Sequence, residues 1–193
     1  EMVWPVKYIR MFDMANDSAL FRTAEQLKAE GFYPVERGRW KKKDELYVPL
    51  YEGKSIHIYN HRYSNIVGGS KALSNQGQSE KSSINDLQKT DYYTTPRYWI
   101  PESEKEKFGH NYVLAFRDIA RTTDERTIIS TIIPSVAAGH KLPVLSLTGS
   151  NKAVQYTLIC ANLNSFIFDF KARQKVKSTN IALYTLEQLP VIP

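Results

Sequence analysis

The stretch YVLAFRDIARTTDERTIISTII, residues 112–133, contains the clearest fold signal in the sequence. Its two ends, Tyr112 to Ile119 and Thr127 to Ile133, are rich in β-branched and aromatic residues, which favour extended backbone. The segment between them, Ala120 to Arg126, is polar and charged, as in an exposed connection. The stretch therefore predicts two strands and a surface segment between them.

Four other segments have the composition of strands or extended chain. They are Trp4 to Phe12, Leu46 to Tyr63, Leu142 to Leu147 and Asn180 to Leu189. Within Leu46 to Tyr63, Glu52-Gly53 indicates a turn, and Phe32 to Asp44 indicates either a hairpin or an exposed loop. The chain is therefore expected to form many short strands rather than a few long ones.

Two segments predict helices. Ala19 to Glu30 follows a cap signal at Asn16-Asp17-Ser18 and ends at Gly31, a residue that suits a helix C-terminus. Asn151 to Lys175 predicts one long helix, and the residues expected on its apolar face are Leu158, Ala161, Leu163, Phe166 and Phe170. Short strands with a few helices indicate an α+β fold whose β-sheet is mostly antiparallel or mixed.

The chain is expected to form a single domain over residues 1–193, a length that suits one hydrophobic core. Residues 68–90 interrupt the pattern, because they are rich in Gly, Ser, Asn and Gln and contain few apolar side chains. We interpret them as a long polar loop. The opening Glu1-Met2-Val3-Trp4 resembles neither a natural start nor a signal peptide, so we expect a piece of a longer protein.

The formal net charge is +6, which favours polyanionic partners because cations release counterions from nucleic acid. A generic basic surface is the alternative explanation. The single cysteine, Cys160, excludes an internal disulfide and fits a reducing, cytoplasmic compartment. No apolar run approaches the ~20 residues that span a bilayer, so no membrane association is expected.

Catalytic signatures are missing. The sequence has no Pro-Pro pair, which the Asn/Asp-Pro-Pro-aromatic motif of an adenine methyltransferase requires, and Gly53-Lys54-Ser55 lacks the upstream glycine of a phosphate-binding loop. Two weaker patterns remain. Asp44, Glu52 and Lys54 imitate a Mg²⁺-dependent nuclease, which stays an alternative function. His57 and His61 are interpreted as strand residues too far apart to share a metal.

Three segments carry a family resemblance. The first is MFDMANDSALFRT (11–23) with YVPLYEGKSIHIYNHR (47–62), the second is PRYWIP (96–101) with FRDIARTTDERTIISTIIP (116–134), and the third is NLNSFIFDFKARQK (162–175) closing on EQLP (187–190). They resemble the C-terminal region of Type IIG, BREX and DISARM adenine-specific DNA methyltransferases and the ending of TaqI-type specificity domains. Asn60 stands where that family has Asp.

The resemblance implies a domain that recognises double-stranded DNA through the major groove and has no catalytic centre of its own. It also implies that S-adenosylmethionine binds to the parent protein's methyltransferase domain, which would be the second partner of this chain. We therefore expect no cofactor and no metal within these residues.

Two kinds of side chain are expected at such a DNA interface: cations for phosphates and amides for base edges. The candidate DNA-binding residues are Arg37, Arg39, Lys41, Lys42, Lys43, Lys54, Arg62, Gln76, Gln78, Arg97, Lys175 and Lys177. The basic run 37–43 is interpreted as a phosphate clamp, with a solvated hairpin tip as the alternative. In the polar loop, Asn85 and Gln88 accompany Gln76 and Gln78 as possible adenine contacts, unless the loop is an insertion without contacts.

Two charged sets are interpreted as mainly structural. Arg117, Arg121 and Arg126 alternate with Asp118, Asp124 and Glu125, which predicts an ion-pair network; the alternative is that the cluster presents its arginines to DNA. Lys171, Arg173, Lys175 and Lys177 lie where the second helix is expected to end, and cations there suit the helix dipole. For Lys175 and Lys177, phosphate contact is a second possible role.

Overall fold

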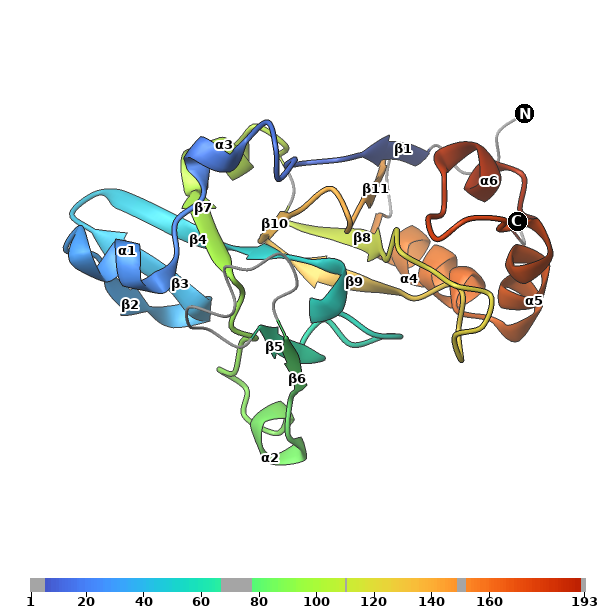
Figure 1. Cartoon of the computed structure of the whole chain (residues 1–193), viewed down its shortest axis with the longest axis horizontal. Coiled ribbons are helices and arrows are strands. Elements are labelled where there is room, and N and C mark those ends of the chain that lie inside the picture. Colours follow the sequence, from blue (N-terminus) through green and yellow to red (C-terminus); the bar gives the residue numbers. More distant parts are fainter. Residues whose placement is uncertain (1–5, 67–77, 110, 149–151, 192–193) are drawn as a thin grey trace.

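The computed structural model describes residues 6–66, 78–109, 111–148 and 152–191. It has an α+β fold, as predicted, with two mostly antiparallel sheets arranged along the long axis of the molecule (Figure 1). Helices α4 and α5 lie at one end, and α1 with strands β2 and β3 lies at the other. The largest cluster of buried apolar side chains includes residues of both sheets, so the sheets share one hydrophobic core.

The first sheet is fully antiparallel, in the order β1-β11-β8-β9. Its strands are β1 (Val6–Ile9), β11 (Val144–Leu147), β8 (Tyr112–Phe116) and β9 (Ser130–Pro134). Each lies within, or within one residue of, a segment expected to be extended. Helices α4 (Lys152–Leu163) and α5 (Phe166–Lys175) follow in the chain, and α4 packs against β8, β9 and β11.

The second sheet is built around β4 (Glu45–Tyr51). It pairs antiparallel with β3 (Arg39–Lys42) and β7 (Tyr98–Pro101) and parallel with the short β10 (Ala137–Ala138). Strand β2 (Tyr33–Val35) completes the predicted hairpin with β3. Helix α1 (Ala24–Ala29) is joined to this sheet by a small second core in which Leu27, Phe32 and Trp99 are buried.

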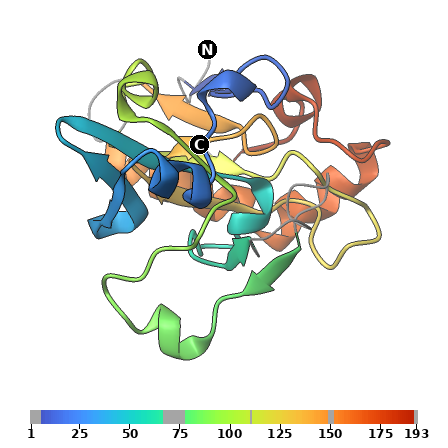
Figure 2. The same ribbon diagram turned by 60° about the vertical axis from the view of Figure 1, so that its left-hand side comes forward.

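The remaining elements are short. Helix α3 (Glu102–Glu106) follows β7, and single 3-10 turns occupy Ser18–Leu20, Glu36–Gly38 and Gly53–Ser55. Strands β5 (Ser64–Ile66) and β6 (Ser79–Lys81) form a two-stranded ribbon that continues into α2 (Ile84–Leu87). We call the described residues 64–66 and 78–92 the arm, because they extend away from the two sheets in both views (Figures 1 and 2).

The first predicted helix begins five residues later than expected. Thr23 caps α1, since its hydroxyl accepts from the Gln26 amide while the Gln26 side chain accepts from the Thr23 amide. The preceding residue, Arg22, is instead extended and exchanges two backbone hydrogen bonds with Trp99 of β7. Pairing with a distant strand therefore displaced the helix start. The predicted end at Gly31 is confirmed by its φ of +86°.

The second predicted helix is two helices. The chain breaks at Asn164, whose side-chain amide exchanges hydrogen bonds with the backbone of Ser130 on β9, and Ser165 then caps α5. The predicted apolar face was largely wrong: of its five residues only Leu163 is buried, whereas Leu158 and Ala161 on α4 and Phe166 and Phe170 on α5 are exposed. On α5 the phenylalanine that is buried is Phe168.

Three other expectations were also wrong. Residues 183–187 form helix α6 (Leu183–Glu187) rather than a strand. The segment 56–63 is a turn, closed by His57 and Asn60 around a left-handed Tyr59, rather than a continuation of β4. The described part of the expected polar loop, residues 78–90, contains β6 and α2; residues 68–77 lie outside the described residues.

None of the helices in the described part of the chain is long and apolar enough to cross a bilayer.

Candidate nucleic-acid interface

A cleft of about 550 Å³ lies between the turn after β4, the β8–β9 connection and the β10–β11 loop. We call it the cationic cleft. Its lining residues are Met14, Glu52, Gly53, Lys54, Arg97, Arg117, Ile119, Arg121, Asp124, Gly139, His140 and Lys141. Five of them are Lys or Arg and two are carboxylates, so positive charge dominates. All but the last three belong to segments 11–23, 47–62, 96–101 and 116–134, which carry the family resemblance.

Close backbone packing forms one wall of the cleft. A Cβ on Gly53 would lie 3.0 Å from the carbonyl oxygen of Lys141, so only glycine fits at this position without a backbone shift. Next to it, the Gly139 amide donates to the Tyr51 carbonyl at 2.9 Å and extends the β4–β10 pairing. The turn after β4 and the β10–β11 loop are thereby held against each other, which brings Lys54 and Lys141 to one site.

Arg97 and Glu52 form the least exposed ion pair of the cleft. Their closest atoms, Nε and Oε1, are 3.4 Å apart, and the two side chains are only 12% and 19% exposed. Neither of these buried atoms has a hydrogen-bond partner among the described residues. The guanidinium also lies over the Tyr98 ring, 5.7 Å from its centroid. The ion pair therefore holds Arg97 and Glu52 in place by charge attraction at the wall of the cleft.

The other cations of the cleft are held to different degrees. Arg117 donates to the Ile56 carbonyl and lies over the Tyr63 ring, and burial lowers the pKa of its guanidinium. Lys141 forms a 3.2 Å ion pair with the fully buried Asp118. Arg121 is exposed, and its side chain makes no hydrogen bond or ion pair within the described parts of the chain. Of these three cations, Arg117 and Lys141 are held by protein groups, and Arg121 is available to a ligand.

The basic run 37–43 is not one clamp. Arg37 and Lys43 occupy turns at opposite ends of β3, both with positive φ, and the strand between them spans about 10 Å at 3.3 Å per residue. Arg39 lies 3.5 Å from the Glu102 carboxylate. The Lys42 ammonium donates to the Glu30 carbonyl at 2.6 Å, at the C-terminal end of α1. Lys41 is half-buried in β3. In the hairpin these cations therefore lie apart, and two of them, Arg39 and Lys42, have partners within the protein.

Arg62 has a structural environment rather than a DNA-facing one. Its guanidinium donates to the carbonyls of Leu87, Lys89 and Tyr92, and it lies over the Tyr92 ring. Because these donors already have acceptors, Arg62 is a weaker candidate for phosphate contact than an unengaged cation, and its DNA-binding role stays a prediction.

The remaining candidate residues lie away from the cleft or outside the described residues. Lys175 donates to the Gln188 side chain at 3.1 Å, and Lys177 is exposed just after α5. Gln78 is exposed at the start of β6. Gln76 lies outside the described residues. Of the candidate residues that the structure describes, Lys54 and Arg97 alone line the cationic cleft.

Asp169 has a structural role that was not predicted from the sequence: it connects α5 to the β8–β9 connection. Its buried carboxylate accepts from the backbone amides of Thr127 and Ile128, each at 2.8 Å, and from Arg173 Nε at 2.9 Å. Arg126 lies 3.6 Å from the same carboxylate. Arg126 is therefore structural, as predicted, but its partner is Asp169 rather than an acid of its own segment. The spacing of Asp169 and Arg173, four residues apart in a helix, is the sequence signal that indicates such a pair.

The residues of the nuclease alternative are not brought together. Asp44 precedes β4 and Glu52 follows it, so about 26 Å of extended strand separates them at 3.3 Å per residue. Among the described residues, no three His, Cys, Asp or Glu side chains gather closely enough to hold a metal ion. Since the two carboxylates occupy opposite ends of a strand, they cannot bind one Mg²⁺ between them.

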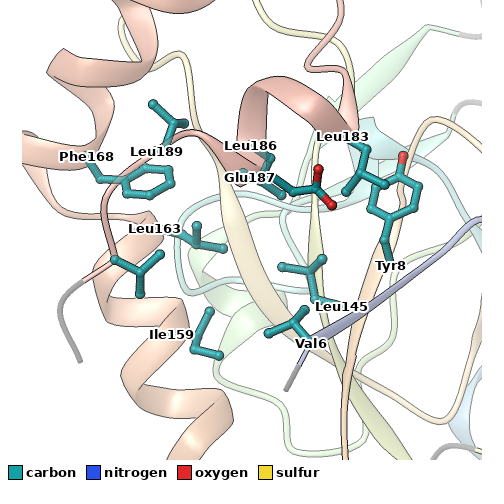
Figure 3. A pocket seen from close by; sticks show the side chains of 11 residues that line it. Val6, Tyr8, Leu145, Ile159, Leu163, Phe168, Leu183, Leu186, Glu187 and Leu189 are labelled. Carbon is teal, nitrogen blue, oxygen red and sulfur yellow. The ribbon is translucent and has the colours of Figure 1, made fainter. Parts of the chain in front are cut away.

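A second, apolar cavity of about 640 Å³ lies between β1, β11, α4, α5 and α6 (Figure 3). Aliphatic side chains such as Val6, Leu145 and Ile159 dominate its lining, and Glu187 is the charged residue among them. Such a lining does not suit a polyanion. The cationic cleft is therefore the candidate nucleic-acid site.

Comparison with known proteins identifies no relative: no family model, no curated protein and no solved structure matches this chain.

Proposed function

We propose that this chain is the DNA-recognition domain of an adenine-specific DNA methyltransferase from a restriction-modification or phage-defence system. One observation carries the proposal: cations from three separate segments, among them Lys54, Arg97 and Arg121, converge on a single cleft. The same segments carry the resemblance to that family. A concave cationic surface binds the phosphates of a duplex and sets its position on the protein.

In this proposal the methyl transfer takes place outside this domain. The methyl donor, S-adenosylmethionine, would bind to the methyltransferase domain of the parent protein, and this domain would present the target sequence to it. The duplex would be the partner of the cationic cleft, in the cytoplasm of the host cell. The cleft suits DNA binding without catalysis, because cations predominate in its lining and its carboxylate Glu52 is paired with Arg97.

The test is a salt titration of duplex binding. A fluorescently labelled 24-base-pair duplex is titrated with wild type and with a Lys54→Gln, Arg121→Gln double variant between 50 and 200 mM salt. These two residues are chosen because both side chains are exposed. Each lost phosphate contact makes the slope of log K against log salt shallower by about 0.9, so a change of about 2 is expected.

The matched control removes the same charge elsewhere. Lys7→Gln with Lys28→Gln neutralises two exposed cations on β1 and α1, outside the cleft. This control is expected to retain most of the wild-type slope. Equal slopes for the cleft variant and the control, or no duplex binding by wild type at 50 mM salt, would refute the proposal.

A further inference from the structure

The first turns of α5 expose three large apolar side chains. Phe166 is 82% exposed, Ile167 is 72% exposed and Phe170 is 59% exposed. On a helix, residues three and four apart are neighbours, so Phe170 lies beside both Phe166 and Ile167. A whole phenylalanine side chain presents about 150–250 Å² of surface, so the three residues form a contiguous patch of a few hundred Å². We call it the apolar patch, and exposed patches of this size often mark an interaction site.

The apolar patch cannot turn into the core, because the rotation of α5 about its axis is fixed. Phe168, on another side of the helix, is buried and lines the apolar cavity. The buried Asp169 carboxylate accepts from the backbone amides of Thr127 and Ile128. Turning the helix would leave this carboxylate buried without its donors, which is strongly unfavourable. The exposure of the patch is therefore a property of the fold, at the end of the molecule where α5 lies (Figure 1).

The charged side chains next to the patch are cations. The Arg126 guanidinium lies over the Phe166 ring, 4.8 Å from its centroid. Lys171 is exposed one turn after Ile167, on the same side of the helix, and Lys175 is exposed one turn further on. The apolar patch is therefore bordered by a cationic rim.

The acids closest to the patch lie elsewhere. Asp169 is buried and forms ion pairs with two arginines. Asp124 and Glu125 precede Arg126 in the chain, and they line a small pocket that also contains His57. Since these acids are paired or turned to another site, the rim keeps its positive charge and complements an acidic partner.

This combination of an apolar centre and a cationic rim distinguishes among possible occupants. A second copy of the chain would bring two cationic rims together, and repulsion between like charges would oppose docking. A DNA backbone is attracted by cations but gains little from three apolar side chains. An anionic bilayer would attract the rim, but interfacial helices present apolar residues along a whole face, whereas the patch is confined to the first five residues of α5. An amphipathic helix that carries acids beside its apolar residues fits both the centre and the rim.

We propose that the apolar patch is a docking site for an acidic amphipathic helix of a partner protein. Phe166, Ile167 and Phe170 form the buried centre of the interface, and Lys171 belongs to its charged rim. The partner helix has apolar residues three and four positions apart, flanked by Asp and Glu. This inference does not depend on DNA binding, because no residue of the patch lines the cationic cleft.

The test is a selection from a library of displayed peptides of about 20 residues, long enough to form a helix. Wild type and the variant Phe166→Ala with Phe170→Ala are used as baits in parallel. We expect wild type alone to enrich net-acidic sequences whose apolar residues recur every three or four positions. The enriched peptide should bind the double variant at least about 30-fold more weakly, the loss for truncated aromatic anchors.

Folding, charge and position are controlled separately. The double variant should keep the wild-type urea midpoint, because both side chains are exposed. Lys171→Glu should weaken the enriched peptide about 5-fold and favour a peptide in which Lys replaces the flanking acids. The matched control, Tyr33→Ala with Ile84→Ala, removes two exposed apolar side chains outside the patch and should bind the peptide as wild type does.

Several outcomes would overturn the inference. If no helical family is enriched, or if the enriched peptide binds wild type and the double variant equally, the patch is not a docking site. If the enriched sequences are basic or neutral, the acidic partner is wrong. Wild-type dimers that the double variant does not form would make the patch a self-association surface. Binding to anionic lipid vesicles or to single-stranded oligothymidine in place of peptide, lost in the double variant, would assign it to those ligands.

The two proposals are tested independently. The double variant should bind duplex DNA with the wild-type salt slope, because the cationic cleft is intact. Loss of peptide binding with duplex binding retained is the expected result for this variant. Failure of wild type to bind any duplex would refute the proposed function and leave the docking site standing.

Discussion

Asp169 on α5 accepts a 2.9 Å hydrogen bond from Arg173 one turn later, and this pair connects the helix to the β8–β9 connection. The same arginine also donates to two backbone carbonyl oxygens of that connection, those of Thr122 and Asp124, each at 2.7 Å. Because Arg121 precedes these carbonyls, the placement of an exposed cation of the cleft depends on a buried carboxylate on another element.

Asp169→Asn is expected to lower the free energy of unfolding by about 3 kcal/mol, because removal of one partner leaves buried cations uncompensated. The measurement is the urea midpoint with an unchanged m-value. Asp91→Asn, at an exposed position of the arm, is the control and should change stability by less than about 0.5 kcal/mol. A loss no larger than that of the control would show that the pair contributes little.

The turn after β4 contains two histidines whose charged forms are disfavoured. Burial lowers the pKa of His57 and of His61, and the nearby Arg117 and Arg62, respectively, lower it further. His57 also stacks on Tyr63 at 4.5 Å between ring centroids. The folded state therefore binds fewer protons at these sites than the unfolded chain does, so stability is present above pH ~6.5 and is lost as the pH falls below it.

We expect His57→Gln with His61→Gln to flatten the dependence of the unfolding free energy on pH between 5.0 and 7.0. Urea unfolding at several pH values in this window isolates the histidines, since most carboxylates titrate near pH 4. Parallel curves for wild type and the double variant would contradict the assignment.

Tyr51 ends β4 next to Glu52 of the cleft, and burial raises the pKa of its phenol to about 12. Its hydroxyl lies near the buried Thr94 side chain, which lowers this pKa in part, and makes no other hydrogen bond within the described residues. Since the unfolded phenol ionises near pH 10, stability is complete below pH 10 and falls by about 2–3 kcal/mol as the pH rises to 12. Tyr51→Phe is expected to remove this alkaline loss.

At neutral pH, Tyr51→Phe should lower stability by less than about 1 kcal/mol, because the hydroxyl interacts only with the Thr94 side chain and makes no hydrogen bond of good geometry. Tyr33→Phe, at an exposed position of β2, serves as the control and should keep the wild-type alkaline profile. A destabilisation of more than about 1 kcal/mol at pH 7 in Tyr51→Phe would indicate that the hydroxyl has a partner in solution.

The strands could be predicted because their signal is local. In β8 and β9, runs of β-branched and aromatic residues favour extended backbone whatever they pair with. Helix boundaries could not be predicted in the same way. Arg22 is extended because it pairs with Trp99, and Asn164 ends α4 because its amide binds Ser130. Each boundary was decided by a partner more than 30 residues away.

The candidate site, too, was predictable from the sequence only in part. The segments that form the cleft were singled out from the sequence, but their convergence on one concave surface was not predictable. Lys54 and Arg97 were selected together with Arg62, and residue type alone does not distinguish them. Arg62 is occupied because the arm folds back over it and supplies three carbonyl acceptors.

The amino-acid sequence by itself determined the α+β class, the short strands and the excess of positive charge, since these follow from local propensity and composition. Only the tertiary structure decided which cations gather at the cleft, which ones hold the arm and the β8–β9 connection, and which acid neutralises Arg126. The physical reason is that a charged side chain takes its role from the nearest acceptor, and in this fold the nearest acceptor usually belongs to a remote segment.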